Sequence, residues 1–592
     1  SAVLRMVQHS GHTVCGSGFT LAICFFSLLF FPVHMIQSIG LGVIMSILSA
    51  IVINLTIIPA ALLAFPKFFT DKCGQSSLPD GGSRGVSLTG DGSLGSPSVE
   101  FSSTAWYRWS RFATSDRAAV LASAILFLVG GGSLVQCKYM KHSMDTWLMA
   151  PRISVSLDTY NHFSRCFSRG STSPFQLLLV PNFTDASACS APIGGAGFYA
   201  EPFWNNATAL LQNIAADIYD FNSGPGSGEA MAPGGLHSIM YVKGDGFRSS
   251  SAGGGQQSGL EIPMPMALFL DPKAPKTPET RKLCSNAQMF FMGLSGACKR
   301  FLDTKRCQDL EFIAPVVANY LDRPPSEVVG LCTVYQELLS TSTTARRDAV
   351  YATLTPAVMD RSRESVEWTR RAREYLTAHA GRYPCLVTHL HGETPQMVDT
   401  IDSIYNRAPA ILLTTMVVCL LLVSFLTVSL AFGLSSVCLI GWTLLVVFAT
   451  GDLVYRGNII GAVTGSITSL HGTGGLAWMV PPLTFSMIFG LGLDYNIFLL
   501  GRVCEYHDAG FSDSDALALG VAKTGPVISS AGLIMAVAFS GMMFSDIPML
   551  NQVGFFLVWA VLLDTFFVRS LATPALHTPL KAWNWWPRGV FR

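Results

Sequence analysis

One acidic residue, Asp494, lies near the middle of an apolar stretch that runs from 479 to 501. At about 1.5 Å of rise per residue, a helix of this length crosses a bilayer. A carboxylate at that depth is costly, so such residues usually face a bundle interior or a wet cavity and often relay ions. A buried carboxyl group can exchange a proton near neutral pH, and the neighbouring Tyr495 adds a hydroxyl. We predict that Asp494 and Tyr495 form the proton relay of a transporter; the alternative is an aspartate that only makes a hydrogen bond between helices.

The residues around Asp494 form a helix face suited to close packing. Ser486, Gly490, Asp494 and Phe498 recur at intervals of four, which places them on one side of a helix. Small residues at this spacing let another helix approach. We expect Ser486 and Gly490 to be packing contacts of the relay helix and Phe498 to pack beneath the acidic pair.

A second charged pair occurs near the end of the last apolar stretch. Asp564 and Arg569 are five residues apart, and mutual pairing with snorkelling explains both. We predict a structural ion pair. Asp452 follows an apolar stretch at its outer end, and we expect it to be solvated.

The composition is that of a membrane protein. Half of the 592 residues are hydrophobic and 13% are charged, against about 25% charged residues in soluble domains. The net charge of +1 without a basic cluster excludes nucleic acid as a partner, and no nucleotide-binding or hydrolase motif is present. We therefore predict no enzyme activity and no cofactor, and a multi-pass protein with about eight spans: 13–31, 36–65, 118–135, 410–432, 434–449, 480–500, 527–544 and 549–571.

Lysine and arginine residues near the predicted spans set the orientation. They concentrate in 67–117, after 501 and in the tail, which are therefore predicted to be cytosolic and leave 138–407 extracytoplasmic, in the plasma membrane or an endomembrane. Asn182 and Asn206 begin glycosylation triplets, and seven cysteines in this region make disulfides plausible, with the connectivity open. His389 and His391 lie near Glu393 without further ligands, so we predict no metal site.

The outer region has an α+β pattern. Strands are expected at 175–180, 236–242, 349–355 and 385–390, and helices at 203–221, 360–379 and 395–407. This order is typical of a ferredoxin-like unit. The predicted domains are 1–66 (end of a first helical repeat), 67–117 (cytosolic linker with an interfacial helix), 118–136 (a span), 137–407 (outer domain with mobile insertions), 408–572 (second helical repeat) and 573–592 (cytosolic tail).

An internal repeat links the two ends of the chain. Residues 10–25 align without a gap on 524–539, and shared cores between two repeats are a common transporter plan. Asp494 lies 31 residues before Gly525, and the same distance before the aligned glycine falls about 20 residues upstream of Ser1. We expect a first Asp-Tyr helix there, and with it the N-terminal half of the same protein as a partner.

Four motifs resemble the second half of the mycobacterial membrane protein large (MMPL) family of the resistance-nodulation-division (RND) superfamily. They are Gly490-Leu-Gly-Leu-Asp-Tyr-Asn, Thr524-Gly-Pro-Val-Ile-Ser-Ser-Ala-Gly, Asp564-Thr-Phe-Phe-Val-Arg and Trp583-Asn-Trp-Trp-Pro. The resemblance implies an RND-type helical bundle with a ferredoxin-like porter domain, which exports lipids or other hydrophobic molecules in exchange for protons. It also implies two Asp-Tyr relay motifs, of which only Asp494 and Tyr495 are matched. The alternative is a lipid or sterol sensor of the Patched/Dispatched-like branch that binds without pumping.

Overall fold

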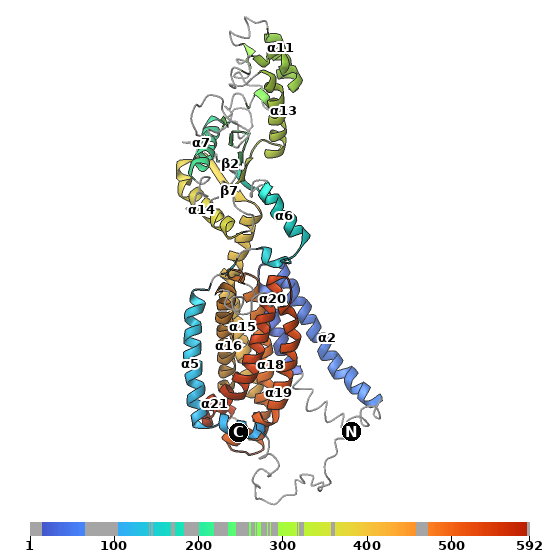
Figure 1. The fold of residues 1–592 in the computed structure, drawn as a ribbon, viewed down its shortest axis with the longest axis vertical. Coiled ribbons are helices and arrows are strands. Elements are labelled where there is room, and N and C mark those ends of the chain that lie inside the picture. The colour runs from blue at the N-terminus through green and yellow to red at the C-terminus, as the bar shows by residue number, and fades with distance from the viewer. Residues whose placement is uncertain are drawn as a thin grey trace, which may run out of the picture. The chain divides into compact units, whose positions relative to one another are not determined.

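The chain is described from a computed structural model, which forms two compact units: Ser1–Arg152 with Thr400–Arg592, and Ile153–Asp399. We call them the helical unit and the outer unit (Figure 1). The described residues are 15–64, 105–140, 142–143, 146–166, 172–182, 200–217, 235–243, 260–261, 267, 269–273, 281, 284–285, 294–315, 318, 325–356, 362–457 and 472–588.

Seven helices in the described residues are long and apolar enough to cross a membrane. The eighth predicted span, 13–31, corresponds to a shorter apolar helix, Cys15–Phe30. The seven are α2 (His34–Ala64), α5 (Asp116–Lys138), α15 (Glu393–Thr427), α16 (Leu430–Gly457), α18 (Val480–Asp508), α19 (Asp513–Met543) and α20 (Pro548–Leu563), which continues through η8 (Asp564–Ala572) into α21 (Thr573–His577). The prediction of a polytopic helical membrane protein is confirmed.

The helix predicted at 395–407 and the span predicted at 410–432 are joined in one helix, which ends before 432. α15 is one continuous helix with Pro409 inside it, and the chain turns later, where Val428 has a φ of 51°. The hydroxyl of Ser429 then accepts a hydrogen bond from the Phe432 N–H at 3.2 Å. A side-chain acceptor at this position satisfies a free N–H group of the next helix, so α16 begins immediately after the turn.

A short helix, α4 (Ala105–Ala113), packs on the ends of the long helices. The Trp109 indole N–H donates to the Ser570 carbonyl oxygen at 3.0 Å, and an ion pair of 2.9 Å joins Arg111 to Asp515. The predicted interfacial helix around 106–112 is therefore present as a helix that is fixed to α19 and η8.

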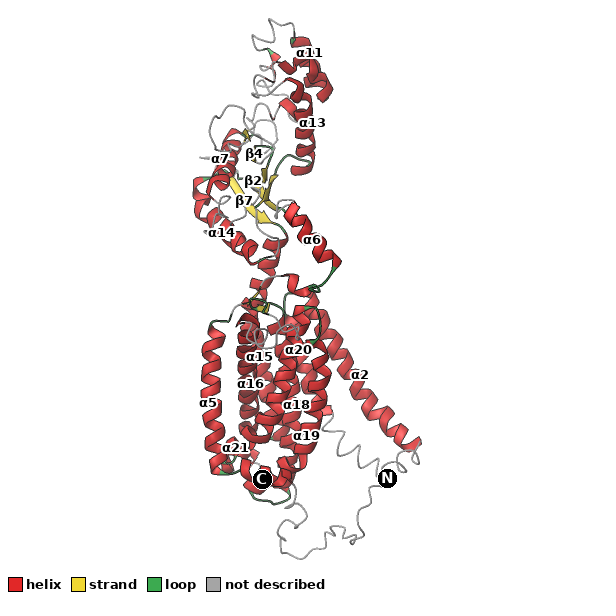
Figure 2. Ribbon diagram, viewed as in Figure 1, coloured by secondary structure: helices red, strands yellow, loops and turns green. Residues whose placement is uncertain are grey.

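The outer unit contains a six-stranded antiparallel sheet in the order β5-β4-β3-β6-β2-β7. Its strands β2, β4 and β7 are labelled in Figure 2. α7 (Glu201–Asp217) follows β2, and α14 (Arg363–His379) connects β6 to β7. The central order β3-β6-β2-β7 is that of a ferredoxin-like unit, which confirms this prediction. The strands are β2 (Phe175–Pro181), β3 (Gly235–His237), β4 (Tyr241–Lys243), β5 (Leu260–Glu261), β6 (Val350–Thr355) and β7 (Leu386–His391).

The single strand predicted at 236–242 is instead a hairpin of β3 and β4. The Ser238 N–H donates to the Tyr241 carbonyl oxygen at 3.0 Å, and the Ser238 hydroxyl accepts from the Met240 N–H at 3.4 Å. Serine side chains that bond to nearby backbone favour turns, and here the turn reverses the chain within a run of apolar residues.

A helical insertion between β5 and β6 is held by covalent and buried polar contacts. Its elements are α11 (Ser295–Thr304), η5 (Cys307–Ile313) and α13 (Pro325–Ser342). Disulfides join Cys284 to Cys298 and Cys307 to Cys332, and Cys385 is also disulfide-bonded, which confirms the expectation of disulfides. Cys189 lies outside the described residues.

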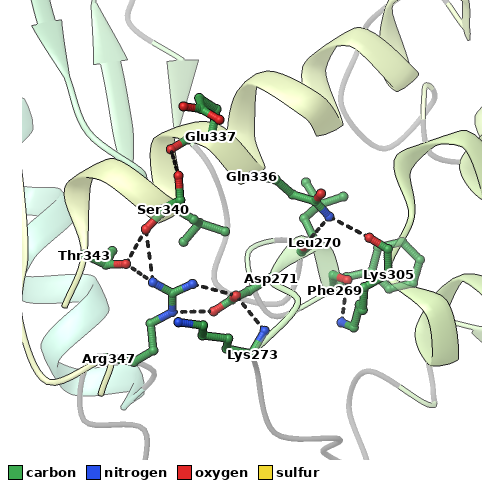
Figure 3. Close-up of polar contacts among 11 residues, drawn as sticks. Phe269, Leu270, Asp271, Lys273, Lys305, Gln336, Glu337, Ser340, Thr343 and Arg347 are labelled. Carbon is green, nitrogen blue, oxygen red and sulfur yellow. Dashed lines mark hydrogen bonds and ion pairs between the residues drawn. The ribbon is translucent and has the colours of Figure 1, made fainter. Parts of the chain in front are cut away.

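A buried ion pair joins an early segment of this insertion to its end, shortly before β6. The Arg347 guanidinium donates to both carboxylate oxygens of Asp271, at 2.9 and 3.0 Å, and both side chains are nearly inaccessible (Figure 3). Arg347 also donates to the Leu339 carbonyl oxygen at 3.0 Å. These contacts satisfy the charge that burial would otherwise leave unpaired.

The compact outer unit, Ile153–Asp399, is shorter than the predicted outer domain at both ends. Residues 137–152 pack with the helical unit, where β1 (His142–Ser143) pairs with β8 (Leu476–Ala477) and the Arg152 N–H donates to the Asp546 carbonyl oxygen. At the other end, 400–407 belong to the uninterrupted α15.

Candidate proton relay in the helical unit

Asp494 lies in α18, the helix with the largest buried share, 67%, among the seven candidate spans. Its carboxylate faces the helix Cys15–Phe30, where the Thr20 side chain lies within interaction range. Carboxylate oxygen Oδ1 is buried without a hydrogen-bond partner among the described residues. Buried polar atoms normally have partners, so an open acceptor site inside a membrane bundle is unusual.

The predicted packing face of α18 lies against the same helix. The hydroxyl oxygens of Ser486 and Ser27 are 3.3 Å apart, and both side chains are buried. A Cβ atom at Gly490 would lie 2.5 Å from Cδ1 of Leu21, so only glycine permits this approach without a shift. The face of α18 that carries Ser486, Gly490 and Asp494 therefore packs against the helix Cys15–Phe30.

Tyr495 points to other helices than Asp494 does. Successive helical residues are turned by about 100°, so neighbours in sequence face different partners. The Tyr495 hydroxyl lies 3.9 Å from the sulfur of Met535 on α19, and its ring lines a small cavity together with Thr443 and Asp564. Phe498 is partly buried in a cluster with Tyr495 and Phe432. Tyr495 thus lies between the Asp494 side of α18 and the second charged pair.

Asp564 and Arg569 form a buried ion pair. Arg569 Nη2 lies 2.9 Å from Asp564 Oδ1, and Nε lies 3.1 Å from both carboxylate oxygens. The segment η8 is a π-helix, and its wider turn brings residues five apart together. The sequence spacing of five is therefore the signal of this pairing.

Snorkelling does not explain the position of Arg569, contrary to the prediction. Its side chain is 2% exposed, and Nη2 donates to the backbone carbonyl oxygen of Gly492, two residues before Asp494. The charged pair is therefore attached to the relay helix itself. Buried intramembrane charges of this kind mark ion pathways in many membrane proteins.

Two other polar residues of the helical unit differ from expectation, Asp452 in its burial and Asn496 because it was not predicted as a site residue. Asp452, expected to be solvated, is fully buried; its Oδ2 accepts from Gln136 Nε2 at 2.7 Å, and Arg456 Nη1 lies 3.6 Å away. Asn496 is buried with no partner for either amide atom among the described residues. Its polar side chain inside an apolar run was the available signal.

The remaining predicted sites lie in the outer unit. The Asn182 side-chain amide donates to the Pro384 carbonyl oxygen at 3.4 Å, and Asn206 is a half-buried residue of α7. Both stay predicted glycosylation sites. His389 and His391 are exposed on β7, and no group of three or more potential metal ligands occurs in the described part of the chain.

Comparisons with known proteins place this arrangement in a family. The model of the MMPL family matches residues 1–115 and 335–591. The mycolic acid-containing lipids exporter MmpL11 of Mycolicibacterium smegmatis is 33% identical over 232 residues, which cover 38% of this chain and 22% of that protein. The trehalose monomycolate exporter MmpL3 of Mycobacterium tuberculosis is 33% identical over 215 residues, or 35% of this chain and 22% of that protein.

Among solved structures, that of the hedgehog release protein Disp from the water bear Hypsibius dujardini aligns with 97% of this chain and 59% of that chain. The TM-score is 0.48 and the sequence identity 11%. The matched stretches span about a fifth of the length of the two curated relatives. The family match covers α18 with Asp494, the buried ion pair and most of the helical unit, so this chain is a multi-pass membrane protein that belongs to the MMPL family.

Proposed function

We propose that this protein is a proton-coupled transporter that moves lipids or other hydrophobic molecules. The observation that carries the proposal is the environment of Asp494, a carboxylate on the most buried span with one oxygen left without a partner. A carboxylate that only joined helices would be expected to have donors on both oxygens. An open acceptor is what a group that binds and releases protons requires.

The contacts around Asp494 support a relay rather than an isolated acid. Tyr495 lines a cavity with Asp564, and Arg569 joins Asp564 to the carbonyl oxygen of Gly492. A change of charge at Asp494 therefore acts on a helix that also holds the ion pair. Coupling of a titrating site to a movement of packed helices needs such a shared element.

The substrate class and the location of the outer unit are parts of the same proposal. Two relatives are named as exporters of mycolic acid-containing lipids and of trehalose monomycolate, which supports a hydrophobic cargo for this chain. We place the outer unit on the extracytoplasmic side, in keeping with the basic residues of 67–117 and the tail. Glycans at Asn182 and Asn206 are a consequence of that placement.

The proposal is tested with the full-length gene product in liposomes that contain a fluorescent acyl lipid and carry a pH gradient. Asp494→Asn keeps the side-chain size but cannot exchange a proton, so gradient-driven movement of the lipid should stop. Glu505→Gln is the matched control, because Glu505 is an exposed acid on the same helix and should leave transport unchanged. Transport by Asp494→Asn at the wild-type rate would refute the proposal.

The sensor alternative makes a different prediction in the same liposomes. A protein that binds lipid without pumping would retain lipid binding and show no dependence on the pH gradient in either the wild type or Asp494→Asn. Gradient-dependent lipid movement by the wild type excludes this alternative.

A further inference from the structure

A second cavity is lined by residues of α4, α18, α19 and η8, and Arg569 is one of them. It has room for about one water molecule. Its polar lining residues are Thr524, Ser529, Thr565, Arg569 and Ser570, and Trp106 of α4 is an aromatic part of its wall.

Two buried polar atoms of the cavity-lining residues lack partners among the described residues. They are Nη1 of Arg569 and Oγ1 of Thr565, and both residues are at most 2% exposed. An unpaired buried donor is destabilising, and more so on a charged group. Because the other nitrogens of Arg569 bond to Asp564 and Gly492, a molecule in this cavity is the remaining source of a partner.

Trp106 is the residue of α4 that lines the cavity. A Cβ atom at Gly525 would lie 2.5 Å from Cε3 of Trp106, so the ring rests directly on the backbone of α19. The same short helix is fixed nearby by the bond from Trp109 to Ser570 and by the ion pair of Arg111 with Asp515. These anchors hold the Trp106 ring over the polar lining.

We propose that this cavity is a hydrated access site for the Asp564–Arg569 pair, and that Trp106 is its lid. Water in the cavity accepts a hydrogen bond from Arg569 Nη1 and exchanges bonds with the Thr565 hydroxyl. When α4 shifts, the pair is exposed to the aqueous phase on the α4 side of the bundle; when α4 is seated, water is retained but does not exchange freely. The role of the site in proton transfer rests on the proposed function, whereas its hydration and its lid do not.

The lid is tested by the reactivity of a cysteine placed in the cavity. Thr565→Cys is reacted with a charged, membrane-impermeant methanethiosulfonate in lipid nanodiscs, which expose both faces, and labelling of the peptide is followed by mass spectrometry. A charged reagent needs an aqueous path, so its rate reports access to the cavity. Exposed Cys15 is the internal reference for an intact, reactive preparation.

We expect Thr565→Cys to react slowly with Trp106 present and about tenfold faster after Trp106→Ala, as for removal of a local closing contact of about 1.4 kcal/mol. Phe112→Ala is the matched control, since Phe112 is an aromatic residue of the same helix that is 44% exposed and does not line the cavity; it should leave the rate unchanged. Equal rates with and without Trp106, or no reaction in either variant, would overturn the proposal.

Ser529→Cys, a second lining position on α19, repeats the measurement should Thr565→Cys fail to fold. The same rate increase on Trp106→Ala is expected there. Labelling does not measure transport, so a dry or permanently open cavity would leave the proposed function standing. Conversely, wild-type transport by Asp494→Asn would refute the proposed function and leave the lid standing.

Discussion

The thiol sulfurs of Cys24 and Cys419 lie 3.7 Å apart, and both residues are fully buried. Cys24 is on the helix that covers Asp494, and Cys419 is on α15. A disulfide has an S–S distance of about 2.05 Å, so the two sulfurs must move closer by a side-chain rotation before the bond can form. A disulfide between these two cysteines would therefore show that the helix Cys15–Phe30 packs against α15 as described.

We predict that a membrane-permeant oxidant such as copper phenanthroline links Cys24 to Cys419 in the intact protein. Mass spectrometry of the digested protein should identify the linked peptides, and Cys24→Ser or Cys419→Ser should each abolish them. Linkage of Cys24 to a different cysteine would contradict the described packing of the helix Cys15–Phe30.

Substitutions of Asp564 and Arg569 should have non-additive effects on the free energy of unfolding. Removing one partner leaves a buried charge, so Asp564→Leu and Arg569→Met should each lower the free energy of unfolding by about 3–5 kcal/mol. The double variant should lose clearly less than the sum of the two changes. Unfolding in detergent measures all three, with Lys581→Met as an exposed control; additive losses would show that the two groups do not interact.

Close packing of α19 on η8 gives a prediction with a control on the same helix. A Cβ atom at Gly532 would lie 2.3 Å from Oγ1 and 3.0 Å from Cβ of Thr565, whereas one at Gly541 would meet no atom within 4 Å. Overpacking of this kind costs about 1–3 kcal/mol. Gly532→Ala should therefore lower the unfolding midpoint in detergent and Gly541→Ala should not; the opposite order would contradict the packing.

Tyr335 supplies a pH-dependent prediction in the outer unit. Its hydroxyl donates to the Ile239 carbonyl oxygen at 3.2 Å, and burial, reinforced by the charge of Asp271, raises the pKa of this hydroxyl well above its usual value. The contribution of the protonated Tyr335 to the stability of the folded unit is fully present below about pH 10, the pKa of tyrosine in the unfolded chain. It declines above that pH, because the unfolded chain releases the proton at a lower pH than the folded chain does.

At neutral pH, Tyr335→Phe should lower the stability of the outer unit by about 1 kcal/mol, the usual loss for one hydrogen bond. As the pH rises above about 10, the stability of the wild type should fall toward that of Tyr335→Phe, because only the wild type has a tyrosine proton to lose at this position. Resistance to limited proteolysis at several pH values measures the difference. A gap between the two proteins that widens with rising pH would be inconsistent with a protonated buried Tyr335.

The sequence predicted the parts of this structure that depend on local pattern. Apolar length located the spans, and the interval of four at Ser486, Gly490 and Asp494 identified the face of α18 that another helix covers. Local pattern did not identify α15 as continuous, because Pro409 is tolerated inside a long helix and because the left-handed turn position is occupied by Val428 and not by the glycine or asparagine that usually marks such a turn.

The site was less predictable because its contacts join distant segments. Thr20 lies beside Asp494, and Arg569 bonds to the Gly492 carbonyl oxygen. Both contacts depend on how the helices pack, and the periodicity of apolar residues does not predict which helices become neighbours. Asp452 was judged by its place at the end of a span, yet Gln136 from α5 covers it. Tertiary partners, rather than position in the sequence, decide whether such a group is buried.

The central claim is that Asp494 carries the proton, and proton flux tests it most directly. Liposomes with a trapped pH dye and an imposed pH gradient should lose the gradient when an acyl lipid is added to the full-length wild type. The carboxyl group is retained in Asp494→Glu, which should keep part of the flux, whereas Asp494→Asn should reduce it to the level of empty liposomes. Lipid-dependent proton flux through Asp494→Asn at the wild-type rate would contradict the relay.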